Sequence, residues 1–397
     1  MSVHSQFDPA YPLYDPRWEH DACGTGFIAQ ISGEASHVLV ETALEALAHL
    51  THRGAQDADA KTGDGAGLLT QIPKTLFYEE LLAKHIPPFD PDDLAVGMIF
   101  LPSQERFPIA NIQCRYIIEQ TLNEVGLALL LWRDPPIDYS LLGTRARTTA
   151  PSIVQVLLKC PRQGPEQQND RTLYYARRLI EQRLLQARMK DCYIVSLSHT
   201  TIVHKGLLAP TELPRFYLDL ADPRFSSAFA IFHQRYSTNT FPSWSLAQPT
   251  RQLAHNGEIN TIQGNRLWMQ AREGTFFSSL WGSKIRSLLP VIQAEGSDSG
   301  QLDNVLELLM HCGRDVLHSM QMLIPPAWEE DAELSGEQRA WFTFHAGITE
   351  PWDGPAALVF SVARRGSGHP GRRMSGSARR ERCSVHRPGL RLPQTPH

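Results

Sequence analysis

A cysteine close to the start of the sequence is the first candidate for nucleophilic chemistry. Cys23 opens an apolar run, Cys23-Gly-Thr-Gly-Phe-Ile-Ala-Gln-Ile31, which is short and is bounded by Gly33, so it predicts a buried β-strand. Gly24 and Gly26 would let a backbone or a ligand approach closely. A thiolate at the end of a strand could attack a carbonyl carbon. The alternative is an inert cysteine, because free cysteine is among the residues most often buried.

The pair Asn256-Gly257 could stabilise the negative charge that such an attack creates. A side-chain amide beside a backbone N–H offers two donors to a tetrahedral oxyanion, and loss of one such donor typically costs about 2.7–4 kcal/mol of transition-state stabilisation. The same dipeptide is also typical of a two-residue hairpin turn. Taken alone, the pair leaves both interpretations open.

Two charged residues near this pair could bind the two ends of an amino acid. Arg235 follows a strand-like segment, and its guanidinium fork suits an α-carboxylate. Asp298 precedes a helical segment, and its carboxylate suits an α-ammonium group. Each has a structural alternative. An arginine near a strand end commonly forms a surface ion pair, and Ser297, Asp298 or Ser299 could cap the helix.

Two other patterns predict local structure. The segment Thr62-Gly-Asp-Gly-Ala-Gly67 lacks the lysine of a phosphate-binding loop and does not complete a dinucleotide-binding motif, so we expect a turn near the active site. His49 and His52 are three residues apart, and Cys23 is their only suggestive partner in the sequence. We therefore expect ordinary histidines at a helix end and no metal site.

The elements that must position these residues are strands and helices in mixed order. Apolar residues at helical spacing predict a helix over residues 40–50. Strands are expected at 68–72, 96–101, 127–132, 153–160, 193–203, 228–232 and 356–360, and further helices at 109–125, 171–189 and 302–323. Because the two kinds of element do not alternate strictly, we predict an α+β fold with substantial antiparallel sheet.

Composition and charge argue against several classes of function. Apolar residues make up 42% and charged residues 20% of the chain, as in folded soluble proteins, and we find no membrane-spanning run or secretion signal. The net charge is −12 over residues 1–360 and +8 over residues 361–397, and an acidic body gives no electrostatic reason to bind nucleic acid. The six cysteines show no paired spacing, which indicates reduced thiols in the cytoplasm.

The end of the chain differs from the rest. Residues 361–397 lose apolar periodicity and are rich in Arg, Gly, Ser and Pro, a composition that buries too little apolar area to offset its ordering entropy. We expect either a disordered tail or an out-of-frame end that replaces further strands. In the second case the sheet would keep an exposed edge after residue 360, and the domain would be poorly stable.

Several segments together resemble a known family. The matching segments are Cys23-Gly-Thr-Gly-Phe-Ile28, Leu50-Thr-His-Arg-Gly-Ala55, Thr62–Gly67, His233–Pro249 and Leu253–Thr261. In this order they resemble the N-terminal glutaminase domain of glutamate synthase large subunits, a class II amidotransferase of the N-terminal-nucleophile type. The resemblance implies a four-layer αββα sandwich of two antiparallel sheets flanked by helices. It also implies a propeptide over residues 1–22 and a glutaminase domain over 23–360, followed by the 361–397 tail.

The resemblance assigns roles to the candidate residues. Cys23 corresponds to the nucleophile that removal of the propeptide exposes. Asn256 and Gly257 correspond to the oxyanion hole. Arg235 and Asp298 correspond to the groups that hold the α-carboxylate and α-ammonium of L-glutamine.

A further arginine is implied near the substrate. Arg53, in the His-Arg-Gly stretch, matches a family arginine close to the active site. Its role is assigned less specifically than those of the other residues.

The implied reaction is hydrolysis of L-glutamine to glutamate and ammonia, for reductive glutamate synthesis from 2-oxoglutarate. Once Cys23 is terminal, its α-amine could move the proton, because a reference pKa of about 7.7–8.0 leaves this group partly neutral at physiological pH. One alternative is an amidotransferase domain with another acceptor. Another is a catalytically silent remnant that binds glutamine without turning it over.

Cofactors and protein partners are implied only for the full-length family members. Those proteins continue with a synthase part that binds FMN and carries an iron–sulfur cluster, and they take electrons from NAD(P)H or ferredoxin. For this chain alone we expect no cofactor and no metal. Its expected partners are L-glutamine, the missing synthase domain and a small electron-transfer subunit, with no nucleic acid and no membrane.

Overall fold

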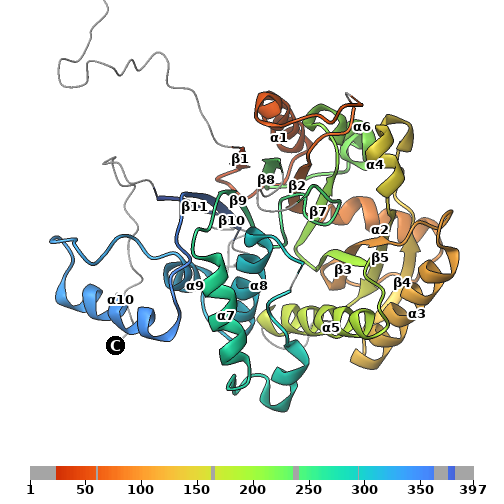
Figure 1. Ribbon diagram of the computed structural model, residues 1–397. Helices are drawn as coiled ribbons and strands as arrows, with labels where there is room; N and C mark the ends of the chain where they lie inside the picture. Colours follow the sequence, from red (N-terminus) through yellow and green to blue (C-terminus); the bar gives the residue numbers. More distant parts are fainter. Residues whose placement is uncertain are drawn as a thin grey trace, which may run out of the picture.

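The computed structural model describes residues 24–59, 61–161, 166–235, 241–293, 295–361 and 374–380 (Figure 1). Within these ranges, eleven strands form three antiparallel sheets. Cys23, the predicted propeptide and most of the predicted tail lie outside the described residues.

The first sheet has the order β1-β8-β2-β7. Its strands are β1 (Thr25–Ala29), β8 (Phe229–Gln234), β2 (Ala66–Gln71) and β7 (Thr201–Gly206). β8 is central and buried throughout, whereas β1 is an edge strand of intermediate burial in which Phe27 is exposed. The prediction of a buried first strand is therefore wrong, because among the described residues β1 has a hydrogen-bonded neighbour on one side only.

The second and third sheets are also antiparallel. The second has the order β4-β5-β3-β6, with strands β4 (Ala128–Arg133), β5 (Ser152–Lys159), β3 (Leu94–Leu101) and β6 (Tyr193–Ser198). The third has the order β11-β10-β9, with strands β11 (Met374–Arg380), β10 (Ala356–Ser361) and β9 (Leu253–Gly257). Strand β3 is buried on both faces, as expected of a strand in an inner layer.

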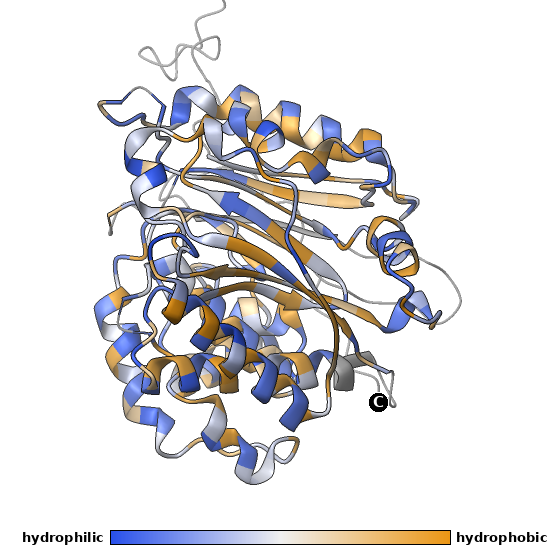
Figure 2. Ribbon diagram, turned by 90° about the vertical axis from the view of Figure 1, so that its right-hand side faces the viewer, coloured by the Kyte–Doolittle hydropathy of each residue, from blue (hydrophilic) through white to orange (hydrophobic). Residues whose placement is uncertain are grey.

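Helices cover the outer faces of the sheets, so the molecule has four layers. Helix α1 (His37–His49) packs on β8, α3 (Pro108–Val125) packs on β4, α5 (Glu166–Gln186) packs on β6, and α8 (Asp298–His311) packs on β9. The second sheet contacts the first through β3, β6 and β7, and the third contacts it through β9 and β10. Figure 2 shows the strands between helices above and below. The predicted αββα sandwich is confirmed, although strand pairing divides the layer opposite the first sheet into two sheets.

The remaining helices surround this sandwich. They are α2 (Lys74–Ala83), α4 (Thr144–Thr149), α6 (Leu213–Phe216), α7 (Ile262–Glu273), α9 (Val316–Leu323) and α10 (Gly336–Ile348). No helix among the described residues combines the length and the apolar character needed to cross a membrane.

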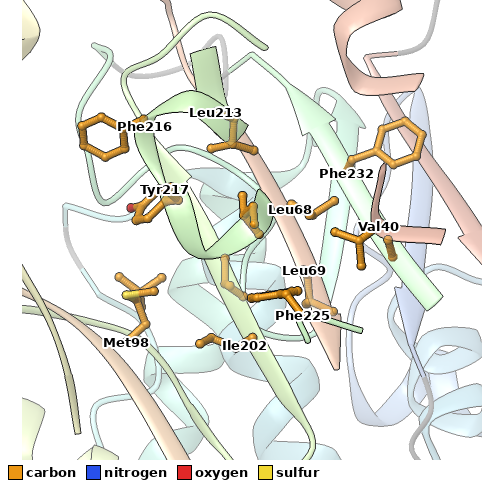
Figure 3. Packing of buried hydrophobic residues seen from close by; sticks show 14 of the residues in the cluster. Val40, Leu68, Leu69, Met98, Ile202, Leu213, Phe216, Tyr217, Phe225 and Phe232 are labelled. Atoms are coloured by element: carbon orange, nitrogen blue, oxygen red, sulfur yellow. The ribbon is translucent and has the colours of Figure 1, made fainter. Parts of the chain in front are cut away.

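The largest apolar core joins α1 to the first sheet and the first sheet to β3. Val40 of α1, Leu68 of β2, Ile202 of β7 and Met98 of β3 belong to this core (Figure 3). Full burial of one such side chain contributes about 1.5–3 kcal/mol. Helix α1 is fixed at its start by Ser36, whose hydroxyl accepts from the Leu39 N–H. This core gives the ends of β1, β2 and β8 a rigid base.

Two predicted elements are each divided in the structure. The apolar run 193–203 turns between β6 and β7, which lie in different sheets, and the Ser198 hydroxyl accepts from the Thr200 N–H at this turn (2.9 Å). The helix predicted over 302–323 is α8 followed by α9. Gly313, with φ 94°, and the capping residue Asp315 separate the two helices.

A strand lies in the segment that was predicted to lack regular structure. Strand β11 pairs with β10 on the side opposite β9, with a register shift between Leu358 and Phe360. For these residues the prediction of an exposed edge after residue 360 is wrong. The two alternatives for residues 361–397, a disordered tail and an out-of-frame end, stay predictions.

Candidate active site

The ends of β1, β2, β8 and β9 meet at one edge of the sandwich. The Gln234 N–H donates to the Gly24 carbonyl (2.7 Å), and the next residue, Arg235, donates from its N–H to the Gly65 carbonyl (2.7 Å). A Cβ atom added to Gly24 would lie 3.0 Å from Asn256 Oδ1. Cys23 itself lies outside the described residues, but the residue bonded to it packs against the side chain of Asn256.

Asn256 and Gly257 end strand β9. They are opposite Ala357 and Ala356 of β10, a strand far away in the sequence, so the pair is not a two-residue hairpin turn. Gly257 has φ 142°, and a Cβ atom there would lie 1.9 Å from the Pro355 carbonyl oxygen. Only glycine fits this position, because both the backbone conformation and the close contact exclude a side chain.

Arg235 has a backbone conformation that is rare for a residue with a side chain. Its φ is 95°, and such conformations cost about 1–3 kcal/mol and persist where the surroundings fix them. Its Nε lies 3.8 Å from Asp64 Oδ2, and its side chain is 44% exposed. A partly exposed arginine side chain on a backbone of defined conformation remains accessible to an anionic ligand.

Asp64 is a site residue that the sequence analysis did not single out. It is buried and its Oδ1 accepts from Gln234 Nε2 (3.2 Å), while its Oδ2 has no hydrogen bond among the described residues. Burial raises the pKa of Asp64. The available signal was its place as the only charged residue of the Thr62–Gly67 segment, whose Gly65 carbonyl accepts from the Arg235 N–H. A turn was predicted for this segment, but Ala66 and Gly67 are the first two residues of β2.

Arg53 lies in the short 3-10 helix Leu50–Arg53 that follows α1. A Cβ atom on the next residue, Gly54, would lie 1.8 Å from Gln234 Nε2 and 3.0 Å from Asp64 Oδ1. The turn that carries Arg53 therefore packs on the Gln234–Asp64 pair. Arg53 Nε is buried and has no hydrogen-bond acceptor among the described residues.

Asp298 is the first residue of α8 and is buried. Its Oδ1 accepts from the Ser299 N–H (2.7 Å) and its Oδ2 from the Ile259 N–H (3.3 Å). The helix cap is Ser297, whose hydroxyl accepts from the Gly300 N–H (3.1 Å). The capping alternative thus applies to Ser297. The Asp298 carboxylate instead binds the backbone N–H of Ile259, two residues after Gly257.

Two buried histidines flank the same strand ends. Burial lowers the pKa of His233 to about 4 and also lowers the pKa of His255, so both are neutral near pH 7. His49 and His52, in contrast, are exposed at the end of α1 and in the following turn, as predicted for helix-end histidines. Within the described residues, no three His, Cys, Asp or Glu side chains are grouped to hold a metal ion.

The sequence that forms this site matches a known protein family. Residues 23–368 match the class-II glutamine amidotransferases. The chain is 42% identical over 366 residues to the glutamate synthase [NADPH] large chain of Bacillus subtilis, an alignment that covers 91% of this chain and 24% of that protein. It is 43% identical over 346 residues to the ferredoxin-dependent glutamate synthase 2 of Synechocystis, covering 86% of this chain and 22% of that protein.

A third relative, the glutamate synthase [NADPH] large chain of Azospirillum brasilense, is 43% identical over 353 residues, with 88% of this chain and 23% of that protein covered. The chain thus spans about a quarter of the length of these relatives. Since the family match covers most of the sequence and every strand end that forms the candidate site, the chain belongs to the class-II glutamine amidotransferases.

Proposed function

We propose that this chain is the glutaminase part of a glutamate synthase, with Cys23 as the nucleophile after residues 1–22 have been removed. The observation that carries the proposal is the packing of Gly24 against Asn256. This packing supports a placement of the nucleophile next to an oxyanion donor. The amino-acid clamp is supported by Arg235 and Asp298, which approach the same strand ends from β8 and α8.

The proposed reaction has two steps. The Cys23 thiolate attacks the side-chain amide carbon of glutamine, and the carbonyl oxygen becomes an oxyanion that the Asn256 amide and the Gly257 N–H stabilise. The protonated α-amine of Cys23 then gives its proton to the departing nitrogen, and ammonia leaves a γ-glutamyl thioester. Water, deprotonated by the same amine, attacks the thioester carbon, and the C–S bond breaks to release glutamate and regenerate Cys23.

The substrate ends are assigned by charge. Arg235 binds the α-carboxylate, and Asp298 binds the α-ammonium group. Asp64 lies behind Arg235, where its contact to Nε favours one orientation of the guanidinium. Arg53 supports the same side of the site through the turn that packs on Gln234.

The ammonia is proposed to serve a synthase part outside this chain. The relatives are named for NADPH, NADH or ferredoxin, and we propose an electron donor of one of these kinds. FMN and an iron–sulfur cluster would belong to that synthase part. No step above uses them. A cytoplasmic location is supported by the free thiols of Cys114, Cys160, Cys192 and Cys312.

Substitution of the nucleophile tests the proposal. Ammonia release from L-glutamine should be lost in Cys23→Ala and kept in the control Cys312→Ala, because Cys312 lies between α8 and α9. A chloroketone analogue of glutamine should alkylate Cys23, as located by peptide mass. Glutamine binding without ammonia release by the parent chain would instead indicate a silent binding protein, and unchanged turnover in Cys23→Ala would refute the assigned nucleophile.

A further inference from the structure

We infer that Ser299 is a positioning residue that joins the ammonium-binding and oxyanion-binding parts of the site into one unit. The inference rests on the proposed function of Asp298 and Asn256. These two residues lie on different elements, α8 and β9, and would have to hold two ends of the same glutamine molecule.

The Ser299 hydroxyl lies between three polar groups. Its Oγ is 3.2 Å from Asp298 Oδ1, 2.9 Å from His255 Nδ1 and 3.3 Å from Gln248 Nε2. A carboxylate can only accept and an amide nitrogen can only donate, so the single hydroxyl proton goes to Asp298, and Ser299 accepts from Gln248. His255 then donates from Nδ1, which fixes its tautomer.

The backbone of His255 is held as firmly as its ring. Its N–H donates to Gln248 Oε1 (2.8 Å), and its carbonyl accepts from Gln248 Nε2 (2.8 Å) and from His233 Nε2 (3.1 Å). His255 immediately precedes Asn256. The network therefore runs from Asp298 through Ser299 to the strand end that presents the oxyanion donor.

Burial makes these bonds hard to replace. Ser299, His255, Gln248 and His233 are each at most 2% exposed, and Asp298 is 3% exposed. Removal of one partner in such a place leaves a donor without an acceptor and with little access to water. Loss of the Ser299 hydroxyl would remove the acceptor of the His255 ring and one of the two acceptors of Gln248 Nε2, and β9 could then shift relative to α8.

The function of this connection follows from the size of the substrate. The α-ammonium group and the side-chain amide of glutamine are separated by a short carbon chain, so the distance from Asp298 to Asn256 must be set closely. A misplacement of about 1 Å at a reacting centre can cost roughly 100-fold in rate. Ser299 sets this distance without contacting the reacting atoms itself.

The test compares Ser299→Ala with Ser299→Thr and with the control Ser319→Ala. Ser319 is also fully buried, but its hydroxyl donates to the Asp315 carbonyl within α9 (2.9 Å). Two quantities are measured for protein with equal active-site titre: kcat for glutamine, which needs the oxyanion donors, and Kd for L-glutamate, whose α-carboxylate and α-ammonium groups need the proposed clamp. Thermal melting shows that each variant is folded.

The inference predicts that Ser299→Ala lowers kcat by roughly 10- to 100-fold and weakens glutamate binding several-fold. Ser299→Thr, which keeps the hydroxyl, should restore most of both, and Ser319→Ala should change neither. A change in only one quantity, or the same result for Ser299→Ala and Ser319→Ala, would overturn the inference. If the proposed function is wrong, the parent chain itself releases no ammonia. This outcome differs from failure of the inference, in which the parent chain is active.

Discussion

Helix α8 carries two buried polar regions that are built in different ways. At its first turn, Asp298 and Ser299 contact the end of β9 through neutral partners and backbone groups. Farther along the same helix, Asp303 and Glu307 belong to a charged cluster, a buried group of arginine and carboxylate side chains. The two regions share one helix and similar burial, but only the first lies beside the candidate site.

The arginine and carboxylate side chains of the charged cluster contact one another. Arg177 contacts Glu181 (2.6 Å) and Glu307 (2.5 Å), and Arg251 contacts Glu181 (3.2 Å). Asp303 accepts from the Gln252 N–H (2.9 Å) and from the Thr250 hydroxyl (2.9 Å). The cluster joins α5, α8 and the segment before β9, so its function is structural.

Arg235, at the candidate site, differs from the arginines of the charged cluster. Its side chain is 44% exposed and, among the described residues, has one carboxylate contact, at 3.8 Å, and its backbone is strained. Removal of one partner from a well-paired buried charge destabilises the fold, whereas a poorly paired and accessible charge can bind a ligand. Substitutions in the two regions should therefore differ in their effects on stability and on rate.

Breaking the charged cluster should affect stability most. Arg251→Met would remove a buried guanidinium that contacts Glu181, Asp303 and Glu307, and removal of one member of a buried ion pair costs about 3–5 kcal/mol. Urea unfolding measures the loss. The control Arg215→Met breaks an exposed pair with Glu212 and should cost less than about 1 kcal/mol. Equal effects of the two substitutions would contradict the structural function of the cluster.

Removing the oxyanion donor should act on rate and leave stability nearly unchanged. Asn256→Ala should lower kcat for glutamine by roughly 100- to 1,000-fold, which is the typical loss for one such donor. Steady-state ammonia release and urea unfolding are measured on the same preparation. Asn123→Ala, an exposed change on α3, should alter neither. If Asn256→Ala keeps its turnover, the proposed oxyanion hole is wrong.

Lowering the pH should weaken the two regions in different pH ranges. The folded-state pKa of His233 is lowered from 6.5 to about 4, so between these values the unfolded chain binds a proton that the folded chain does not, and stability falls as pH falls. The pKa of Glu181 is lowered from 4.5 to about 2, so its stabilising contribution is lost only below pH 4.5. The site histidines should therefore weaken the fold first.

The matching variant is His233→Gln, which has no titrating ring. Between pH 7 and pH 5 the parent chain should lose about 2 kcal/mol more of its unfolding free energy than this variant does. The control His49→Gln makes the same substitution at an exposed histidine at the end of α1. Parallel curves for the parent chain and His233→Gln would show that His233 is not held neutral.

Local sequence patterns predicted a helix or strand well where it has one apolar face or one continuous apolar run. The apolar stripe of α1 and the continuous apolar residues of β3 and β8 identified these elements correctly. The run 193–203 was predicted as a single strand, because an apolar run that crosses from one sheet to another keeps the same composition on both sides of its turn.

The candidate site was predicted less completely. Arg235, Asp298 and Asn256 were found from residue type and from resemblance, and their roles stay predictions. Asp64 and Ser299 could not be assigned to the site, because their importance depends on pairing between β2 and β8 and on the distance between α8 and β9. The charged cluster was missed for the same reason.

The most direct test of the account is the joint measurement of intact mass and ammonia release on the same preparation. Our account predicts that the rate of glutamine hydrolysis is proportional to the fraction of molecules that begin at Cys23, because only a terminal cysteine has a free α-amine to move the proton. Full activity in molecules that still carry residues 1–22 would contradict it.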